Sequence, residues 1–288
     1  MRYSIIYIIL LSGLLVACQK ESRIPIPYEG DKIVLNSFIQ PDSLVYIRVT
    51  RSKPVKEYGN LQFPALENAE VEIFEDGTRL PVYWKVINGR GYYVTDIAAK
   101  EGKRYTLNVA DSGLTSVSAE DSTPRKPAIK NGSAQKNTNR VRFTLTDDVA
   151  KTNYYRIRMY HADMVGGVMV PNKKDTVKFR LDPSFNNSFI DIIGDSYYSE
   201  VMVNDERVNG KEVLFVLQTS KRISSDYMMV EVNSLNEGGY KYLQATYEQR
   251  LGGTIDLSLD ASGIFSNVGN GYGIVAGINA SWLAFTVQ

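Results

Sequence analysis

Short stretches in which apolar and polar residues alternate recur along most of the chain. Residues 45–49 alternate with a period of two, and the same period returns at 71–73 and 105–109. This period is typical of strands that bury one face. Between residues 31 and 122 six or seven strand-like stretches occur and none has a helical period. We therefore expect a β-sandwich of immunoglobulin or prealbumin type over residues 31–122.

Turn residues separate these stretches. Asn88-Gly89 lies between two apolar stretches, and this dipeptide predicts a tight hairpin. Residues 123–127 read Thr-Pro-Arg-Lys-Pro, which favours irregular extended backbone. We interpret residues 123–128 as a linker between two domains.

Strand patterns resume after the linker, and one segment departs from them. In residues 237–251 large apolar side chains recur at spacings of three and four, which predicts an amphipathic helix near 238–251 closed by Gly252-Gly253; they are Tyr240, Leu243, Tyr247 and Leu251. The tail then returns to two strands, with a break expected at Asn279-Ala280-Ser281. Residues 129–288 are therefore expected to form a larger, mostly β domain, either a β-sandwich or a jelly-roll-like arrangement.

The first seventeen residues follow a different pattern. Arg2 precedes a run that is apolar from residue 5 to residue 16 except at Ser12 and Gly13, and Ala17 stands before Cys18. A basic start, a short apolar core and a small residue at the end are typical of a secretory signal. The run is shorter than the ~20 residues that cross a bilayer. Residues 1–17 are therefore interpreted as a signal peptide.

Leu15-Val16-Ala17-Cys18 resembles the lipobox of bacterial lipoproteins at all four positions. The resemblance implies cleavage between Ala17 and Cys18, a diacylglycerol on the Cys18 sulfur and usually an amide-linked acyl chain such as palmitate. Two or more acyl chains, at ~0.8 kcal/mol per buried methylene, hold a protein stably on a membrane. Residues 18–30 would then be a lipidated tether. The alternative is an ordinary signal peptide in which Cys18 is merely apolar, and a small-x-small cleavage site fits less well here.

Composition narrows the environment and the partners. Cys18 is the only cysteine among 288 residues, so the exported chain has no intramolecular disulfide. The formal net charge is +1, and loss of residues 1–17 removes Arg2 and leaves a charge of about zero. No basic block suggests a nucleic-acid partner. Contact with a membrane is expected through the lipid on Cys18.

Few residues are available for catalysis. A Ser-His-Asp or Cys-His site would have to use His161, the single histidine, and no Gly-x-Ser-x-Gly elbow occurs. We expect His161 to lie on the surface just past a strand. Metal sites built on clustered histidines or thiolates are excluded by count. We assign no catalytic residue, no metal ligand and no cofactor.

Acidic pairs leave two alternatives open. Two carboxylates can hold calcium or serve a glycosidase, but none of the pairs has the one-three-five spacing of a calcium loop. Acidic residues at strand ends more often accept backbone hydrogen bonds or face water. The candidates are Asp147-Asp148, Asp205-Glu206, and Asp191 with Asp195.

Glycines and tyrosines are the remaining candidates. Gly269, Gly271 and Gly273 suggest a phosphate-binding loop, but a strand-like segment follows them where such a loop needs a helix, so a tight turn is expected. Adjacent tyrosines, as at Tyr92-Tyr93 and Tyr154-Tyr155, place one ring in the core and one outward. Outward rings can stack on sugars or dock a protein partner. Alternatively, tyrosine simply suits a half-buried strand.

Several segments together resemble a family of Bacteroidota lipoproteins, the domain of unknown function 4249. The resemblance covers nearly the whole mature chain in order, except that residues 254–262 lack the proline that the family often carries there. The matching segments are IVLNSFIQPDSLVYIRVTRSKPV (33–55), DDVAKTNYYRIRMY (147–160), VNDERVNGKEVLFVL (203–217), GGYKYLQATYEQ (238–249) and FSNVGNGYGIVAG (265–277). Members resemble accessory lipoproteins encoded beside TonB-dependent receptors, with no established activity.

These observations predict a lipid-anchored outer-membrane lipoprotein that is not an enzyme and serves as an accessory binding or assembly subunit, working with a TonB-dependent receptor in nutrient uptake. Gln19 is not the aspartate that marks inner-membrane retention in enterobacteria. Whether the protein faces the periplasm or the cell surface stays open, and no ligand is assigned. The alternatives are a cell-surface adhesin or envelope scaffold and, more remotely, a hydrolase that uses the acidic pairs.

Overall fold

The computed structural model describes residues 28–54, 57, 62–149, 151–185, 196–250 and 264–288. The chain is mostly β with one helix in these residues, as the sequence predicted. The elements are β1 (Ile33–Ile39), β2 (Leu44–Arg51), β3 (Glu70–Glu75), β4 (Thr78–Leu80), β5 (Val82–Ile87), β6 (Arg90–Ala98), β7 (Arg104–Ala110), β8 (Val117–Ser122), β9 (Ala128–Ala134), β10 (Arg140–Thr146), β11 (Tyr154–Val165), β12 (Val168–Thr176), β13 (Phe179–Leu181), β14 (Glu200–Asn204), β15 (Glu212–Thr219), β16 (Tyr227–Leu235), α2 (Glu237–Arg250) and β17 (Tyr272–Thr286).

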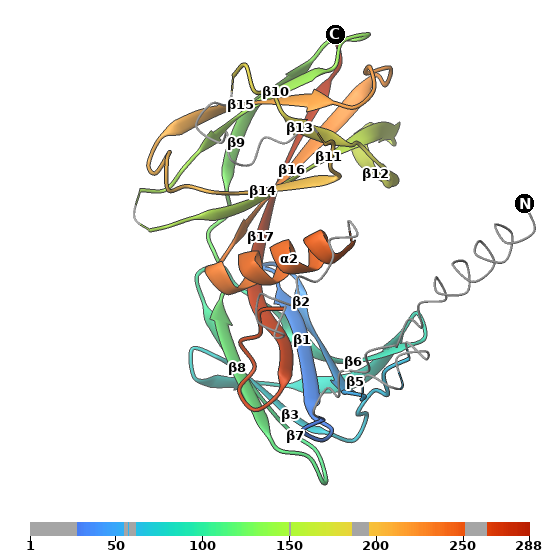
Figure 1. Cartoon of the computed structure of the whole chain (residues 1–288), viewed down its shortest axis with the longest axis vertical. Coiled ribbons are helices and arrows are strands. Elements are labelled where there is room, and N and C mark those ends of the chain that lie inside the picture. Colours follow the sequence, from blue (N-terminus) through green and yellow to red (C-terminus); the bar gives the residue numbers. More distant parts are fainter. Residues whose placement is uncertain (1–27, 55–56, 58–61, 150, 186–195, 251–263) are drawn as a thin grey trace, which may run out of the picture.

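One long sheet runs through both ends of the molecule (Figure 1). Its strand order is β12-β11-β16-β17-β1-β2-β6-β5, and β14 also pairs with β11. A four-stranded sheet, β4-β3-β7-β8, packs on one half and forms a core around Ile73, Tyr105 and Leu107. A second, β13-β15-β10-β9, packs on the other half around Phe143 and Phe215, whose rings stack 5.2 Å apart. The result is two sandwiches, or lobes, that share one sheet.

Strand β17 joins the two lobes. Its first part pairs in parallel with β1, from Tyr272 opposite Val34 to Gly277 opposite Ile39. Its second part pairs antiparallel with β16, from Ile278 to Thr286. Val275 accordingly lies in the core of the first lobe and Phe285 in that of the second.

The break expected at Asn279-Ala280-Ser281 is therefore wrong, because β17 continues through it. The polar side chains that suggested a turn are buried and have partners outside their own sheet. Asn279 Nδ2 donates to the Pro124 carbonyl (2.9 Å), and Ser281 Oγ donates to the Pro127 carbonyl. A strand can carry such residues in a buried position when their hydrogen bonds are satisfied.

Residues 123–128 are packed against β17 and do not form a free connection. Thr123, Pro124 and Pro127 are buried. The Glu101 carboxylate accepts hydrogen bonds from Lys126 N (3.1 Å) and from Asn279 Nδ2 (2.9 Å). The two lobes are thus discontinuous in sequence, since the first also contains Val268 and Val275 from beyond the predicted boundary.

Two elements that the sequence predicted from neighbouring residues are present in the structure. The Asn88-Gly89 hairpin is confirmed, with both residues at positive φ (50° and 73°) between β5 and β6. Helix α2 also forms, and it lies across the face of the long sheet opposite the two sandwiches (Figure 1). Leu243 is buried there beside Leu235 and Ile278.

The glycine-rich segment before β17 is a turn, as expected, and a strand follows it. Asn270 adopts a φ of 62°, and Gly273 has a φ of 111°. A Cβ at Gly273 would lie 2.1 Å from the Leu35 carbonyl oxygen, so the parallel β1–β17 pair needs glycine there. The phosphate-loop interpretation is excluded because no helix follows the turn.

Candidate functional site

The acidic pairs hold loops together. Asp147 accepts a hydrogen bond from the Tyr155 hydroxyl (2.6 Å) and one from Gly210 N (2.7 Å). Asp205, 1% exposed, accepts hydrogen bonds from the backbone and side-chain nitrogens of Asn153 (2.8 and 3.2 Å). These bonds fix the loop between β14 and β15 against the end of β10 and the start of β11. The carboxylates accept donors from the protein itself, in the way that turn carboxylates commonly do.

The other acidic candidates do not join them. Asp148 forms an ion pair with Arg125 (3.2 Å), and Glu206 is exposed. Asp191 and Asp195 lie outside the described residues, as do Leu251 with Gly252-Gly253 and the departure at 254–262. Within the described part of the chain, no three His, Cys, Asp or Glu side chains gather as a metal site would require.

His161 lies within β11, so the expectation that it follows a strand is wrong. Its side chain is half-buried, and Nδ1 lies 2.9 Å from Ser225 Oγ. Ser225 is a hydrogen-bond partner and not the carboxylate that would orient the ring in a Ser-His-Asp arrangement.

A polar ladder that the sequence analysis did not single out crosses the long sheet next to α2. Arg158 donates two hydrogen bonds to the Glu231 carboxylate, from Nε and Nη2 (2.8 Å each). Tyr160 Oη and Asn233 Nδ2 donate to the same carboxylate (3.1 Å each), and Arg156 Nε donates to Asn233 Oδ1 (2.9 Å). Every group in this ladder has a partner, which a buried charge requires. The available signal was the pair of arginines with period two in an otherwise apolar strand.

Electrostatics keep the ladder charged. Burial alone would raise the pKa of Glu231, but the hydrogen bonds and charge of Arg158 hold that pKa below its ordinary value. Burial would likewise lower the pKa of Arg158, and Glu231 raises it instead. Burial and the negative charge of Glu231 raise the pKa of Tyr160 to about 12. The Glu231 carboxylate is thus ionised and accepts hydrogen bonds from Arg158, Tyr160 and Asn233.

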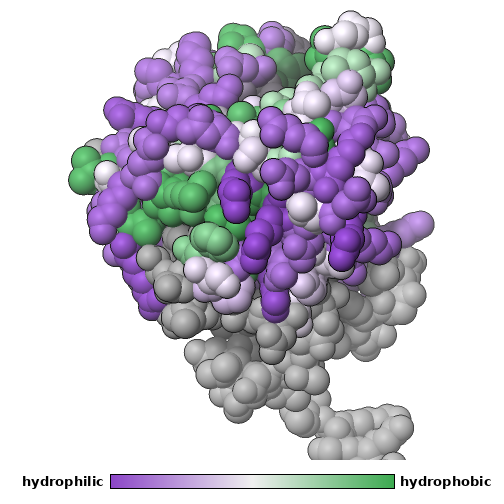
Figure 2. Space-filling model, turned by 90° about the horizontal axis from the view of Figure 1, so that it is seen from above, coloured by the Kyte–Doolittle hydropathy of each residue, from purple (hydrophilic) through white to green (hydrophobic). Residues whose placement is uncertain are grey.

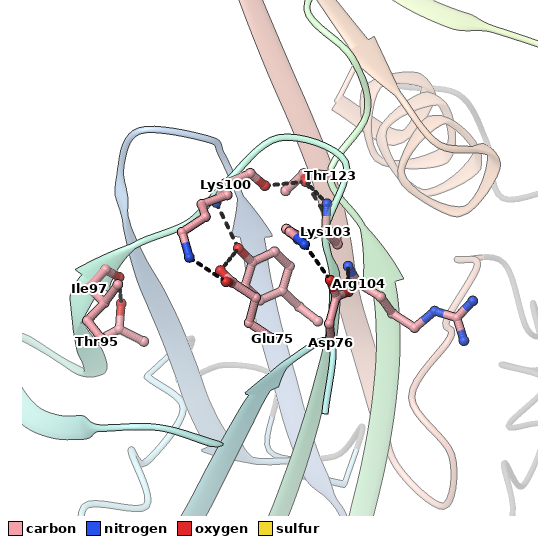
Figure 3. Close-up of polar contacts among 9 residues, drawn as sticks. Glu75, Asp76, Thr95, Ile97, Lys100, Lys103, Arg104 and Thr123 are labelled. Carbon is pink, nitrogen blue, oxygen red and sulfur yellow. Dashed lines mark hydrogen bonds and ion pairs between the residues drawn. The ribbon is translucent and has the colours of Figure 1, made fainter. Parts of the chain in front are cut away.

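A second polar cluster joins the turns of the first lobe to residue 123 (Figure 3). Glu75 is buried and accepts hydrogen bonds from Tyr105 Oη (2.6 Å) and Lys100 Nζ (2.7 Å). The pKa of Glu75 falls because these two bonds outweigh its burial. Thr123 Oγ1 donates to the Lys100 carbonyl (2.6 Å). This cluster connects the β3–β4 turn, the β6–β7 turn and the start of the 123–128 segment.

Asp76 extends the cluster at its exposed side. Its carboxylate accepts a hydrogen bond from Lys103 Nζ (2.8 Å) and another from Arg104 N (3.0 Å), as Figure 3 shows. Since these carboxylates accept hydrogen bonds from neighbouring turns, the cluster joins those turns to one another.

The tyrosine pairs divide between core and surface where they lie in strands. Tyr93 and Tyr155 are buried, and Tyr92 and Tyr154 are half-buried on the other face. Exposed apolar side chains gather instead on the β11–β12 hairpin, where Val165 is 60% exposed and Val168 is 64% exposed. Figure 2, which views the molecule from above, shows hydrophobic surface lying among hydrophilic side chains at this end.

The N-terminal predictions lie outside the described residues. The signal peptide 1–17, the cleavage site at Ala17 and Cys18, the lipid on Cys18 and most of the tether therefore stay predictions. Among the described residues, no helix is both long enough and apolar enough to span a bilayer.

Fold and contacts together define a mostly β protein of packed sandwiches with one helix. A family model described as a domain of unknown function (DUF4249) matches residues 19–282, and the chain belongs to this family. The family that the sequence resemblance indicated, the domain of unknown function 4249, is thereby confirmed. No match is found among curated proteins.

Solved structures resemble the chain only distantly. One, described as a membrane anchored protein from Corynebacterium diphtheriae, is 12% identical, with 73% of this chain and 55% of that chain covered and a TM-score of 0.21. Another, named BspA_C_mut, is 9% identical, with 74% of this chain and 97% of that chain covered and a TM-score of 0.17. This chain thus spans about half the length of the first. Neither similarity carries an argument about function.

Proposed function

We propose that this protein is a lipid-anchored outer-membrane lipoprotein and serves as a non-enzymatic accessory subunit for binding or assembly. The observation that carries the proposal is the four-residue lipobox ending at Cys18. The family match supports it, because it begins at residue 19, directly after the predicted lipidated cysteine.

The hydrogen bonds of the buried carboxylates support a binding or assembly role over hydrolysis. A hydrolase of the kind considered would need a carboxylate or histidine free to exchange protons with a substrate. Asp147 and Asp205 instead accept hydrogen bonds from the loops that they fix, and Glu231 is occupied by Arg158. The partner that we propose, a TonB-dependent receptor, rests on the family resemblance.

The anchor is tested by metabolic labelling with a palmitate analogue. We expect the wild-type protein to be labelled and to fractionate with outer membranes. Cys18→Ser should lose the label and leave the membrane fraction, whereas Ser22→Cys, a substitution in the tether, should keep both. Equal labelling of wild type and Cys18→Ser would refute the anchor.

Partnership is tested separately, by co-purification of the detergent-solubilised protein with a TonB-dependent receptor from the same cells. Recovery of an intact receptor in stoichiometric amount supports the proposal. Recovery of an extracellular matrix protein without any receptor would favour the adhesin alternative. Protease treatment of intact cells then distinguishes the two faces of the membrane.

A further inference from the structure

An open groove of about 820 Å³ lies on the long sheet, at the end away from α2. Its origin is an irregularity in the edge hairpin. Ala162 of β11 pairs with Pro171 of β12, and Tyr160 pairs with Thr176, so residues 172–175 stand opposite residue 161 alone. The extra residues bow out of the β11–β12 pairing, and residues 172–174 form one wall of the groove. Bulges of this kind are frequent beside binding sites.

An aromatic platform forms the floor of the groove. Trp282 of β17 lines it and is 37% exposed, although a tryptophan has much apolar surface to hide. The Tyr160 ring packs at 5.6 Å from Trp282, with an interplanar angle of 34°. The polar ladder holds Tyr160 through Glu231, so the platform is fixed before any ligand arrives.

The rim of the groove is polar and of mixed sign. Asp163 contributes from β11, and Asn172, Lys173 and Lys174 contribute from the bowed part of β12. Lys173 Nζ lies 5.7 Å from the centre of the Trp282 ring. Val165, Val170, Pro171 and Met229 also line the groove. The aromatic ring of Trp282 therefore lies among apolar side chains, with donors and acceptors at the rim.

We propose that this groove binds a saccharide chain, with one sugar ring stacked on Trp282. The apolar C–H face of a pyranose matches the indole, and its hydroxyls match the mixed donors and acceptors of the rim. An acyl chain would contact the apolar part of the lining but would form no hydrogen bonds with the donors and acceptors of the rim. A small anion would meet Asp163 and would gain nothing from the indole. The groove is open, which suits a chain that continues beyond the site.

A saccharide site would give the proposed accessory subunit its ligand. That the protein captures a ligand at all is taken from the proposed function. The test uses the full-length protein in detergent, run in native gels that contain xylan, laminarin, dextran or polygalacturonate. We expect at least one polysaccharide to retard the wild-type protein. Trp282→Ala should weaken that retardation by about tenfold or more.

Two further variants control for folding. Trp84→Phe changes the other tryptophan, which packs on Tyr93 in the first lobe, and should bind as the wild type does. Lys173→Ala alters an exposed rim residue and should weaken binding about threefold with an unchanged melting temperature. The proposal is overturned if none of the four polysaccharides retards the protein, or if Trp282→Ala and Lys173→Ala both bind like the wild type. Palmitate labelling of the same protein tests the lipid anchor separately, so failure of the saccharide site can be distinguished from failure of the proposed function.

Discussion

Gly277 of β17 should tolerate no side chain, because the end of β8 crosses it closely. A Cβ at Gly277 would lie 1.9 Å from the Ser122 carbonyl oxygen and 2.8 Å from Thr123 Cα. These are backbone atoms, so relief requires β8 and β17 to separate. Separation also breaks the hydrogen bond from Gly277 N to Asp121 Oδ2 (2.9 Å).

The expected cost of Gly277→Ala follows from these two effects. Overpacking in a tight site costs about 1–3 kcal/mol. Losing a hydrogen bond to a charged acceptor costs about 1.5–3 kcal/mol. We therefore expect Gly277→Ala to lower the free energy of unfolding by about 2.5–6 kcal/mol, measured by urea denaturation followed by circular dichroism.

Gly269→Ala is the matched control, since Gly269 precedes the same strand. Its Cβ would meet its nearest atom, the Ser118 carbonyl oxygen, at an ordinary 3.5 Å. We expect this variant to stay within about 0.5 kcal/mol of the wild type. If the two variants unfold at the same urea concentration, the backbone of Ser122 does not lie as close to Gly277 as we describe, and the reasoning is refuted.

Three other outcomes follow from the charged groups. Asp205→Ala should destabilise the protein by about 1–3 kcal/mol because it leaves the buried backbone N–H of Asn153 without an acceptor, whereas the Asn153 side chain keeps the carbonyls of Asp148 and Lys151. Glu206→Ala should change stability by less than about 0.5 kcal/mol in the same urea assay. Arg158→Leu should cost about 3–5 kcal/mol by stranding Glu231, and the double variant with Glu231→Leu should recover most of that loss; no recovery would contradict the pairing. The pKa of Tyr160 is raised to about 12, so the folded state binds the hydroxyl proton more tightly than the unfolded state does. The protonated hydroxyl therefore contributes about 2–3 kcal/mol to the free energy of unfolding below pH 10, and this contribution disappears between pH 10 and 12. Denaturation midpoints from pH 9 to 12 should fall less steeply in Tyr160→Phe, and equal slopes would count against this pKa.

Local patterns predicted the elements whose causes are local. Asn88-Gly89 gave a hairpin because the positive φ angles of its turn depend on those two residues. The helix near 238–251 appeared because the spacing of Tyr240 and Leu243 repeats within a few turns. In each case the interactions that fix the element span only a few residues.

The contacts of β17 could not be predicted in this way. Asn279 and Ser281 indicated a turn, yet their partners Pro124 and Pro127 lie about 155 positions away. Parallel pairing with β1 joins segments at opposite ends of the chain. Alternation of apolar and polar residues identifies a strand but not its neighbours.

The candidate site shows the same limit. The sequence singled out Asp147 and Asp205 as acidic residues at strand ends. Both carboxylates accept hydrogen bonds from backbone N–H groups, which is the common role of acidic residues at such positions. It did not single out Glu231 or Trp282. Their importance comes from neighbours on β11 and β12 that only the folded sheet brings together.

The position of β17 also constrains the order of folding. A ribosome produces the chain from its N-terminus, so β1 and β16 are both made before the strand that lies between them. Neither sandwich can close its long sheet until residues 272–286 are available. Contacts of such long sequence separation slow folding and leave strand edges open meanwhile. The nascent chain therefore needs protection from aggregation until residues 272–286 have been made, and the two lobes should reach their native state together.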